Sequence, residues 1–197
     1  MRVQADRQPL RADARRNRQR ILDAARQAFA AEGRSVPLDE IARRAKVGPG
    51  TLYRHFPTKE ALFEAIIHER LRLLIEQARA ACTAPDPAGA LFGAIDAVVA
   101  DAQAKAELID ALTGTGIDVH GSVAAMAAEL RHEIARLLER AQEHGVVRRD
   151  VGIGEVMALL GGVIVALRQP GGAGLVPERA LAVLRDGLRA GCAAGVR

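Results

Sequence analysis

Residues 35–59 read SVPLDEIARRAKVGPGTLYRHFPTK, and this stretch decides the fold. Its apolar side chains recur at steps of three and four residues, the spacing that places them on one face of an α-helix. They are Ile41, Ala42 and Ala45, then Leu52 and Phe56. Residues 46–48 separate the two groups, and Pro49 suits the first position of a helix, where its missing N–H is not needed. The pattern predicts two short amphipathic helices joined by a tight turn.

The second helix of this pair, from about Pro49 to His55, has a polar face. At about 1.5 Å per residue it is roughly 10 Å long, which fits a DNA major groove about 12 Å wide. The side chains opposite its apolar face include Thr51, Tyr53 and Arg54. Hydroxyl, phenol and guanidinium groups bind phosphates and base edges. The stretch therefore predicts a helix-turn-helix that binds double-stranded DNA.

The distribution of charge favours binding to a polyanion at one end of the chain only. The 197 residues carry a formal net charge of +4. Residues 1–59 contain 14 Lys and Arg against 6 Asp and Glu, whereas residues 60–197 contain 14 against 18. A basic N-terminal part suits nucleic acid, and the acidic remainder does not.

Several other classes of protein do not fit the sequence. Cys82 and Cys192 lie far apart and predict no disulfide framework, which favours a reducing compartment. No signal-peptide pattern is found, and the longest apolar run, residues 156–167, is shorter than the roughly 20 residues that cross a bilayer. The histidines have no metal-binding spacing, and no nucleophile or phosphate-loop motif occurs. We therefore expect a soluble cytoplasmic protein that is not an enzyme and that has no cofactor, no metal and no membrane contact.

The whole chain is predicted to be all-α, with about nine helices. A flexible basic arm over residues 1–13 precedes a helix-turn-helix domain over residues 14–60, and residues 61–197 form a second helical domain. Capping residues, glycines and prolines mark the ends of the helices. The predicted helices span about 14–32, 38–45, 49–55, 58–81, 87–103, 105–112, 122–145, 153–168 and 177–194, and the helix over 58–81 links the two domains.

Residues from about 15 to 63 resemble the N-terminal DNA-binding domain of TetR/AcrR-type transcriptional regulators. The matching residues are Ile21–Ala25, Ile41, Ala42, Ala45, Val47, Gly50–Phe56 and Thr58–Leu62. The resemblance covers about a quarter of the chain. It implies a repressor that a small-molecule effector releases from a palindromic operator in the bacterial cytoplasm, where the bound protein is associated with the nucleoid. Two alternatives stay open: a helical protein-interaction adaptor, and a cysteine redox sensor that uses the same DNA-binding fold.

The resemblance also implies which residues contact DNA. Tyr53, His55 and Lys59 match positions that hold phosphates, and Thr51 and Arg54 match positions near phosphates or base edges. Lys59 lies in the first turn of a predicted helix, where its ammonium and the free backbone N–H groups can face one phosphate. The full set of predicted DNA contacts is Ser35, Arg44, Lys46, Gly48, Pro49, Gly50, Thr51, Tyr53, Arg54, His55 and Lys59.

Two departures from the family pattern concern the turn and the start of the second helix. Gly48 and Pro49 stand where the family often has polar side chains, so few side chains remain for bidentate base contacts. We therefore expect Arg54, Thr51 and the arm to supply most of the discrimination, helped by DNA shape. Lys46 stands where the family usually has glycine. A left-handed Lys46 would be strained by about 1 kcal/mol and would bring a cation near the phosphates, and the alternative is an indifferent turn lysine.

A helix-turn-helix of this size makes few contacts, so a homodimer on a palindromic site is expected. The predicted interface lies on the last two long helices, which would form a four-helix bundle with those of the partner subunit. An internal core is the alternative for the same residues. The predicted interface residues are Val156, Leu160, Gly161, Val163, Ile164, Leu167, Leu181, Leu184 and Leu188.

The resemblance further implies an effector pocket in the second domain. Its lining is expected to be aliphatic, because residues 64–197 contain one aromatic residue and no Trp or Tyr. Such a lining favours an aliphatic effector. The predicted pocket residues are Phe92, Asp96, Thr113, His120, Met126, Met157 and Arg168.

Overall fold

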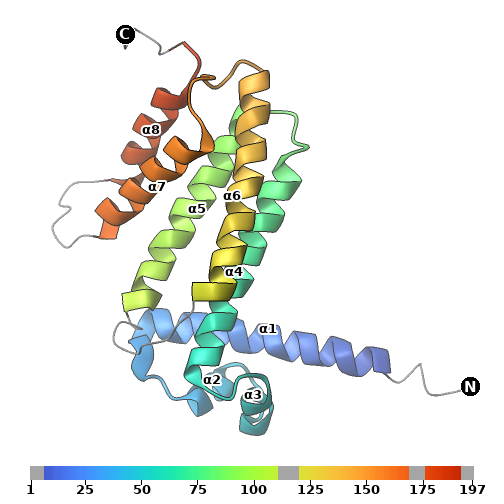
Figure 1. Ribbon diagram of the computed structural model, residues 1–197. Coiled ribbons are helices and arrows are strands. Elements are labelled where there is room, and N and C mark those ends of the chain that lie inside the picture. Colours follow the sequence, from blue (N-terminus) through green and yellow to red (C-terminus); the bar gives the residue numbers. More distant parts are fainter. Residues whose placement is uncertain (1–6, 111–119, 169–175, 192–197) are drawn as a thin grey trace, which may run out of the picture. The chain divides into compact units, whose positions relative to one another are not determined.

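The computed structural model describes residues 7–110, 120–168 and 176–191, and gives the backbone alone for residues 7–12, 34, 103–110, 120–122 and 168. These residues form eight α-helices and one 3-10 helix, and their only β-type pairing is an isolated bridge (Figure 1). The all-α prediction is confirmed. The elements are α1 (Arg7–Glu32), η1 (Gly33–Ser35), α2 (Leu38–Arg44), α3 (Pro49–His55), α4 (Lys59–Ala81), α5 (Pro87–Asp110), α6 (His120–Glu143), α7 (Ile153–Arg168) and α8 (Pro177–Leu188).

Three helices differ from their predicted bounds by more than two residues, each for a local reason. α5 is one helix where two were expected, because residues 94–110 contain no Gly or Pro to break it. α1 begins at Arg7 and takes in part of the predicted arm, since Pro9 lies in its first turn, where a missing N–H costs nothing. α8 ends at Leu188, and Gly191 just beyond it has a φ of +113°, which only glycine adopts easily.

The chain divides into two compact units. Of the described residues, 7–68 and 107–110 form the first, and 69–106, 120–168 and 176–191 form the second. The division falls inside α4, between its third and fourth turns, so this single helix belongs to both units. A helix shared in this way is a continuous covalent connection between them.

The first unit is built around a stacked pair of phenylalanines. The rings of Phe29 in α1 and Phe63 in α4 have centroids 4.2 Å apart, with 18° between their planes. Leu52 of α3 and Phe56, which follows α3, are buried in the same cluster, as predicted. Thr58 caps α4, because its Oγ1 accepts the N–H of Ala61 at 3.1 Å. These contacts hold α3 between α1 and the start of α4.

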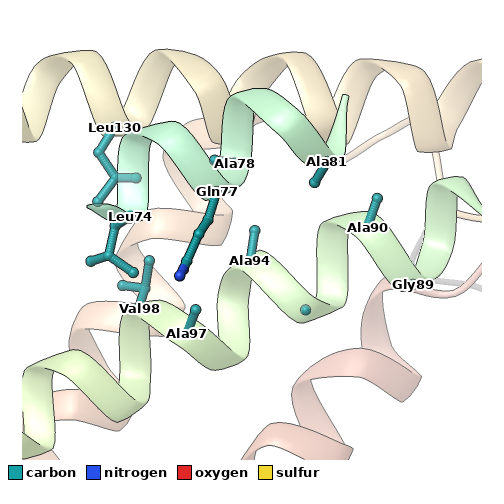
Figure 2. Close-up of a pocket in the computed structure, with 11 residues that line it drawn as sticks. Leu74, Gln77, Ala78, Ala81, Gly89, Ala90, Ala94, Ala97, Val98 and Leu130 are labelled. Atoms are coloured by element: carbon teal, nitrogen blue, oxygen red, sulfur yellow. The ribbon is translucent and has the colours of Figure 1, made fainter. Parts of the chain in front are cut away.

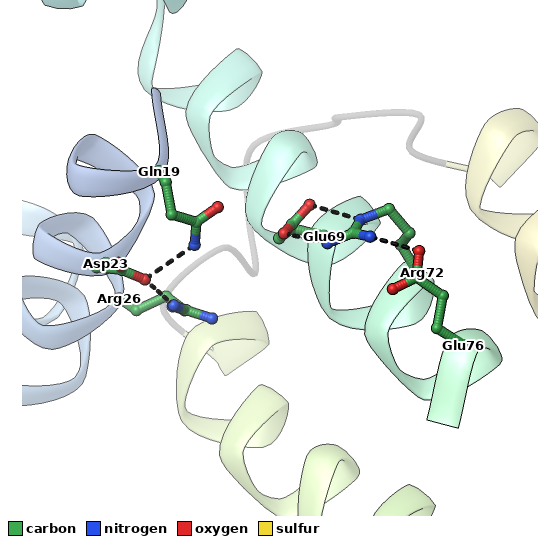
Figure 3. Close-up of polar contacts among 6 residues, drawn as sticks. All are labelled: Gln19, Asp23, Arg26, Glu69, Arg72 and Glu76. Atoms are coloured by element: carbon green, nitrogen blue, oxygen red, sulfur yellow. Dashed lines mark hydrogen bonds and ion pairs between the residues drawn. The ribbon is translucent and has the colours of Figure 1, made fainter. Parts of the chain in front are cut away.

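Ion pairs within single helices cover exposed faces in both units. Figure 3 shows Gln19–Asp23–Arg26 in α1 and Glu69–Arg72–Glu76 in α4. Such pairs at spacings of three or four residues stabilise a helix by only about 0.3–0.5 kcal/mol each. The apolar clusters therefore dominate the stability of both units.

In the second unit, α4 is tied to its neighbours by arginine–carboxylate pairs. Arg70 pairs with the buried Asp101 of α5. Arg79 donates from Nε to Glu133 Oε1 of α6 at 3.0 Å, and Arg136 donates from Nη1 to Glu133 Oε2 at 2.8 Å. Burial opposes ionisation of Glu133, yet the two guanidinium hydrogen bonds lower the pKa of its carboxyl. Breaking a buried ion pair is costly, so the pairs of Arg70 with Asp101 and of Arg79 with Glu133 help to hold α4 within this unit.

The last two helices, α7 and α8, form a pair that is joined to the rest of the second unit. The N–H of Arg148, before α7, donates to the carbonyl of Leu188 at the end of α8 at 2.9 Å. Arg185 of α8 pairs with Asp96 of α5, and this carboxylate raises the pKa of the guanidinium. Although α7 carries the longest apolar run, no helix within the described residues is both long and apolar enough to cross a membrane.

Candidate nucleic-acid interface

α2, α3 and the turn between them form the predicted helix-turn-helix. Ile41 and Ala42 of α2 and Leu52 of α3 have no exposed surface. Val47 in the turn is half-buried and packs against the same cluster. The apolar spacing of residues 35–59 therefore places one face of each short helix in the core and leaves the other face outside.

The turn contains a strained residue. Lys46 has a φ of 54° and is the only residue other than glycine with a positive φ in the described part of the chain. Its N–H donates to the carbonyl of Arg43 at 3.1 Å, and the N–H of Val47 donates to the carbonyl of Ala42 at 3.0 Å. The left-handed conformation costs about 1 kcal/mol, which the packing of Val47 and these hydrogen bonds offset. Its side chain is exposed.

The N-terminal end of α3 carries small side chains, because Gly48, Pro49 and Gly50 lie there. The carbonyl of Gly48 accepts the N–H groups of Thr51 at 2.9 Å and Leu52 at 3.2 Å, and no side chain caps the helix. A Cβ added at Gly48 or Gly50 would meet no other heavy atom within 4 Å. Packing within the chain therefore does not require glycine at either position. The missing side chains leave room for a partner to approach the backbone at this end of α3.

Most of the predicted DNA contacts lie on the exposed side of this unit. Tyr53 is 44% exposed and Arg54 is exposed, while Thr51, His55 and Lys59 are half-buried. Arg54 donates from Nε to the carbonyl of Gly50 one turn earlier, at 3.1 Å. Within the described residues, no carboxylate pairs with Arg54 or Lys46, so both charges can meet a polyanion.

Tyr53 is coupled to the preceding helix. The charge of Asp39 in α2, together with a hydrogen bond to its carboxylate, raises the pKa of the Tyr53 phenol. Tyr53 therefore stays protonated near neutral pH, and in the free protein the Asp39 carboxylate accepts its O–H.

Arg44 and Ser35, two further predicted DNA contacts, also have partners inside the protein. Arg44 pairs with Glu32, with Nη1 and Oε1 2.6 Å apart, and with Glu40, with Nε and Oε1 2.7 Å apart. Hydrogen bonds from Arg43 and Arg44 lower the pKa of Glu40 to about 2. Ser35 donates its hydroxyl to the carbonyl of Glu32 at 3.1 Å. Arg44 and Ser35 thus stabilise the junction between α1, η1 and α2, and their roles in DNA contact stay predictions.

Two arginines of α1 that were not predicted from the sequence also contact the helix-turn-helix. Arg20 donates from Nη2 to the carbonyl of Lys46 at 2.9 Å. The guanidinium carbon of Arg18 lies 5.5 Å from the centroid of the Phe56 ring, within the range of a cation–π interaction. The spacing of residues along the chain carries no signal for either contact, since each joins segments far apart in sequence.

Four of the predicted pocket residues have described side chains, and they lie at different places in the second unit. Phe92 is buried, Asp96 pairs with Arg185, and Met126 and Met157 are half-buried on different helices. Thr113 and the side chains of His120 and Arg168 lie outside the described residues.

Of the two cysteines, Cys192 lies outside the described residues. Cys82 is half-buried and its thiol contacts the carbonyl of Ala78 at 3.5 Å.

A cavity of about 230 Å³ lies elsewhere in the second unit, between α4, α5 and α6. Figure 2 shows Ala90, Ala94 and Ala97 of α5 on one side and Gln77 and Ala81 of α4 on the other. Gln77 supplies the only polar side chain of the lining. The complete lining is Leu74, Gln77, Ala78, Ala81, Gly89, Ala90, Gly93, Ala94, Ala97, Val98 and Leu130.

The predicted interface residues of α7 and α8 fall into two groups. Five of them are buried within the single chain: Val156, Leu160, Leu181, Leu184 and Leu188. Burial within the single chain is what the internal-core alternative expects for these five side chains. Gly161 is exposed, and Val163, Ile164 and Leu167 are half-buried. An apolar groove of about 400 Å³ runs along the outer side of the pair, flanked by Leu159, which is 53% exposed, and Val183, which is 69% exposed.

Comparison with known proteins places both units among transcriptional regulators. Residues 21–66 match the bacterial regulatory proteins of the tetR family, and residues 86–190 match the C-terminal domain of SbtR-like transcriptional regulators. The crystal structure of the TetR transcription regulatory protein from Mycobacterium vanbaalenii is 44% identical, with a TM-score of 0.76 over 92% of this chain and 99% of that one. The TetR transcriptional regulator SCO0520 from Streptomyces coelicolor is 33% identical, with a TM-score of 0.73 over 88% and 99%.

A third relative matches a shorter stretch of the chain. The HTH-type transcriptional regulator UidR of Escherichia coli (strain K12) is 44% identical over 59 residues, which are 29% of this chain and 30% of UidR. The match thus spans less than a third of that relative's length. What the second unit recognises does not follow from it.

Proposed function

This chain belongs to the TetR family of bacterial transcriptional regulators, and we propose on that basis that it binds a palindromic operator as a homodimer, represses transcription there and is released by a small-molecule effector. The observation that carries the DNA-binding part is the exposed side of the helix-turn-helix, which presents Tyr53, Arg54 and the ammonium of Lys46. The place of action is then the bacterial cytoplasm, with the bound protein at the nucleoid.

Different side chains are proposed to bind the phosphates and the bases of the DNA. Lys46, Tyr53 and Lys59 offer an ammonium, a phenol O–H and a second ammonium, which suit phosphate oxygens. Arg54 offers the one exposed guanidinium on α3, and arginine is the side chain that pairs bidentately with guanine. Gly48 and Gly50 leave the backbone open, so DNA shape contributes as well.

Selection of bound sequences from a random pool of double-stranded DNA tests this function directly. We expect a short sequence with two-fold symmetry whose half-sites lie one helical turn of DNA apart or a multiple of it. The preference over scrambled DNA should persist above about 0.1 M salt, where phosphate attraction alone fades. A pool that yields no enriched sequence would contradict the proposal.

Replacing Arg54 by alanine is expected to relax the specificity of DNA binding. A lost bidentate contact costs about 1–3 kcal/mol at one base position and leaves the other positions unchanged. Repeating the selection with the variant measures this as one position of each half-site losing its preference. Arg43→Ala is the matched control, because the Arg43 guanidinium is already paired with Glu40. Equal weakening of all sequences by Arg54→Ala would assign Arg54 to phosphates instead.

For the effector, the cavity between α4, α5 and α6 suits a small uncharged aliphatic molecule. Its walls are alanine, glycine, leucine and valine, and the Gln77 amide can donate or accept a single hydrogen bond. An effector acts only by binding one arrangement of the protein better than another. Because α4 belongs to both units, a ligand that presses on its second half can change the DNA affinity of the first unit.

Filling the cavity should separate effector response from DNA binding. Ala94→Leu places a larger side chain in the lining, so operator affinity should stay within about twofold of the wild type while release by ligand is lost. The probe is a homologous series of straight-chain alcohols, and the measurement is operator release by fluorescence anisotropy. Ala100→Leu, at an exposed position of the same helix, is the control. Unchanged release from Ala94→Leu would place the effector elsewhere.

A further inference from the structure

The peptide group between Lys46 and Val47 is held at both of its polar ends. Its oxygen accepts a hydrogen bond from Arg20 Nη2 of α1 at 2.9 Å. Its N–H, on Val47, donates to the carbonyl of Ala42 in α2 at 3.0 Å. A peptide group is planar, so hydrogen bonds at both its oxygen and its N–H fix its orientation.

This orientation sets the direction in which α3 leaves the turn. Lys46 is left-handed, with a φ of 54°, and a right-handed Lys46 would rotate the following peptide and point its carbonyl away from α1. Pro49, the first residue of α3, comes three residues later. Between them, the β-region backbone of Gly48 has no side-chain cap that could hold the direction independently.

α1 also contacts the residue at the other end of α3. Arg18 lies over the ring of Phe56, which follows His55 and is 3% exposed. The two arginines are two positions apart in α1, a helix held to the core by Phe29. α1 therefore reaches both ends of α3, by a hydrogen bond before it and an aromatic contact after it.

We propose that Arg20 is a positioning residue for DNA recognition, which holds the strained Lys46 turn so that α3 meets the major groove in the productive orientation. The proposal rests on the proposed DNA-binding function. Arg20 acts through the Lys46 carbonyl, and its charge contributes no more to phosphate attraction than that of another exposed arginine of α1. The hydrogen bond is charge-assisted, the stronger class of such bonds.

A double-mutant cycle between Arg20 and Lys46 tests this. Arg20→Ala should lower affinity for the selected operator by about tenfold, the size expected for a hydrogen bond to a charged donor. Lys46→Gly removes the left-handed strain and one cation, so it should reduce the salt dependence of binding by about one ion. Because glycine adopts this φ without help, Arg20→Ala in the Lys46→Gly background should cost less than about twofold.

A second readout does not depend on DNA. In the free protein, Arg20→Ala should raise the hydrogen-exchange rate of the Val47 amide, and Lys46→Gly should restore much of its protection. Arg16→Ala is the matched control for loss of one exposed cation from α1, because the Arg16 side chain is 66% exposed and contacts only Asp13 among the described residues. This control should lower affinity for operator and scrambled DNA equally and leave the Val47 amide unchanged.

The outcomes are distinct. If the wild type shows no preference for any symmetric operator, the proposed function fails and the positioning role fails with it. If the wild type has an operator but Arg20→Ala matches Arg16→Ala in affinity, in its effect on scrambled DNA and in Val47 exchange, the DNA-binding function stands and the positioning role is wrong. An equal loss from Arg20→Ala in the wild-type background and in the Lys46→Gly background also overturns it.

Discussion

Replacing Leu159 and Val183 together by glutamate is expected to convert the protein into monomers that no longer bind operator DNA at concentrations where the wild type does. Both side chains are exposed in the single chain and flank the apolar groove along α7 and α8. If this face is the dimer interface, each subunit then buries two carboxylates without partners, at a cost of several kcal/mol. A lone helix-turn-helix contacts one half-site, so affinity should fall by at least about a hundredfold.

Sedimentation velocity and a mobility-shift assay measure the two effects on the same preparations. Leu73→Glu is the matched control, because Leu73 is an exposed leucine of α4 in the same unit. Gly162→Gln is a second probe of the interface: an added Cβ there meets no heavy atom within 4 Å, so the subunit itself tolerates it. Dimers that persist in the double glutamate variant would place the interface elsewhere, and monomers with full operator affinity would remove the need for two copies.

The helix-turn-helix could be predicted from the sequence because its information is local. The apolar spacing of Ile41, Leu52 and Phe56 specifies which face of each helix is buried, and all three are buried as expected. The start of α4 is also specified locally, because the hydrogen bond between Thr58 and the N–H of Ala61 spans only three residues. The sequence left the conformation of Lys46 open: the glycine that the family usually has at this position raised the left-handed alternative, and the structure shows it.

Contacts between distant segments could not be read in the same way. Arg20 and Lys46 are 26 residues apart, and no motif or spacing in the sequence around either residue indicates the hydrogen bond between them. Arg44 is an intermediate case, because Glu40 lies four residues earlier and this spacing is typical of a helical ion pair. That pairing could have been weighed against a role in DNA contact from the sequence alone.

The alanines that line the cavity and the exposed Leu159 and Val183 were not among the predicted residues, for different reasons. Large or polar side chains such as Phe92 and Asp96 stand out in a sequence as pocket residues. The cavity instead lies beside the small side chains Ala90, Ala94 and Ala97, which leave space between the helices. On α7, an apolar stripe does not distinguish packing within a chain from packing between chains, because both exclude water. The structure shows that Val156 is buried and that Leu159 is 53% exposed.

Replacing Phe63 by alanine is expected to abolish DNA binding while leaving the protein dimeric. The Phe63 ring is 1% exposed and stacks on Phe29, so its removal leaves a cavity that costs about 3–5 kcal/mol, a large part of the roughly 5–15 kcal/mol that stabilises a typical domain. The loss falls on the unit that holds α3, whereas α7 and α8 belong to the other unit. Thermal unfolding by circular dichroism, operator binding and sedimentation measure the three consequences.

Phe63→Leu separates the loss of buried volume from the loss of the stacked ring. Leucine keeps most of the buried apolar surface, so this substitution should lower the free energy of unfolding by less than about 1.5 kcal/mol. We expect this variant to bind the operator near the wild-type affinity. If Phe63→Ala instead binds the operator as tightly as the wild type, the stacked pair is not what holds α3 in place, and the hydrogen bonds of the Lys46 turn must suffice. If it loses dimerisation as well, the two units fold as one cooperative body, and damage to either unit would then disrupt both DNA binding and dimerisation.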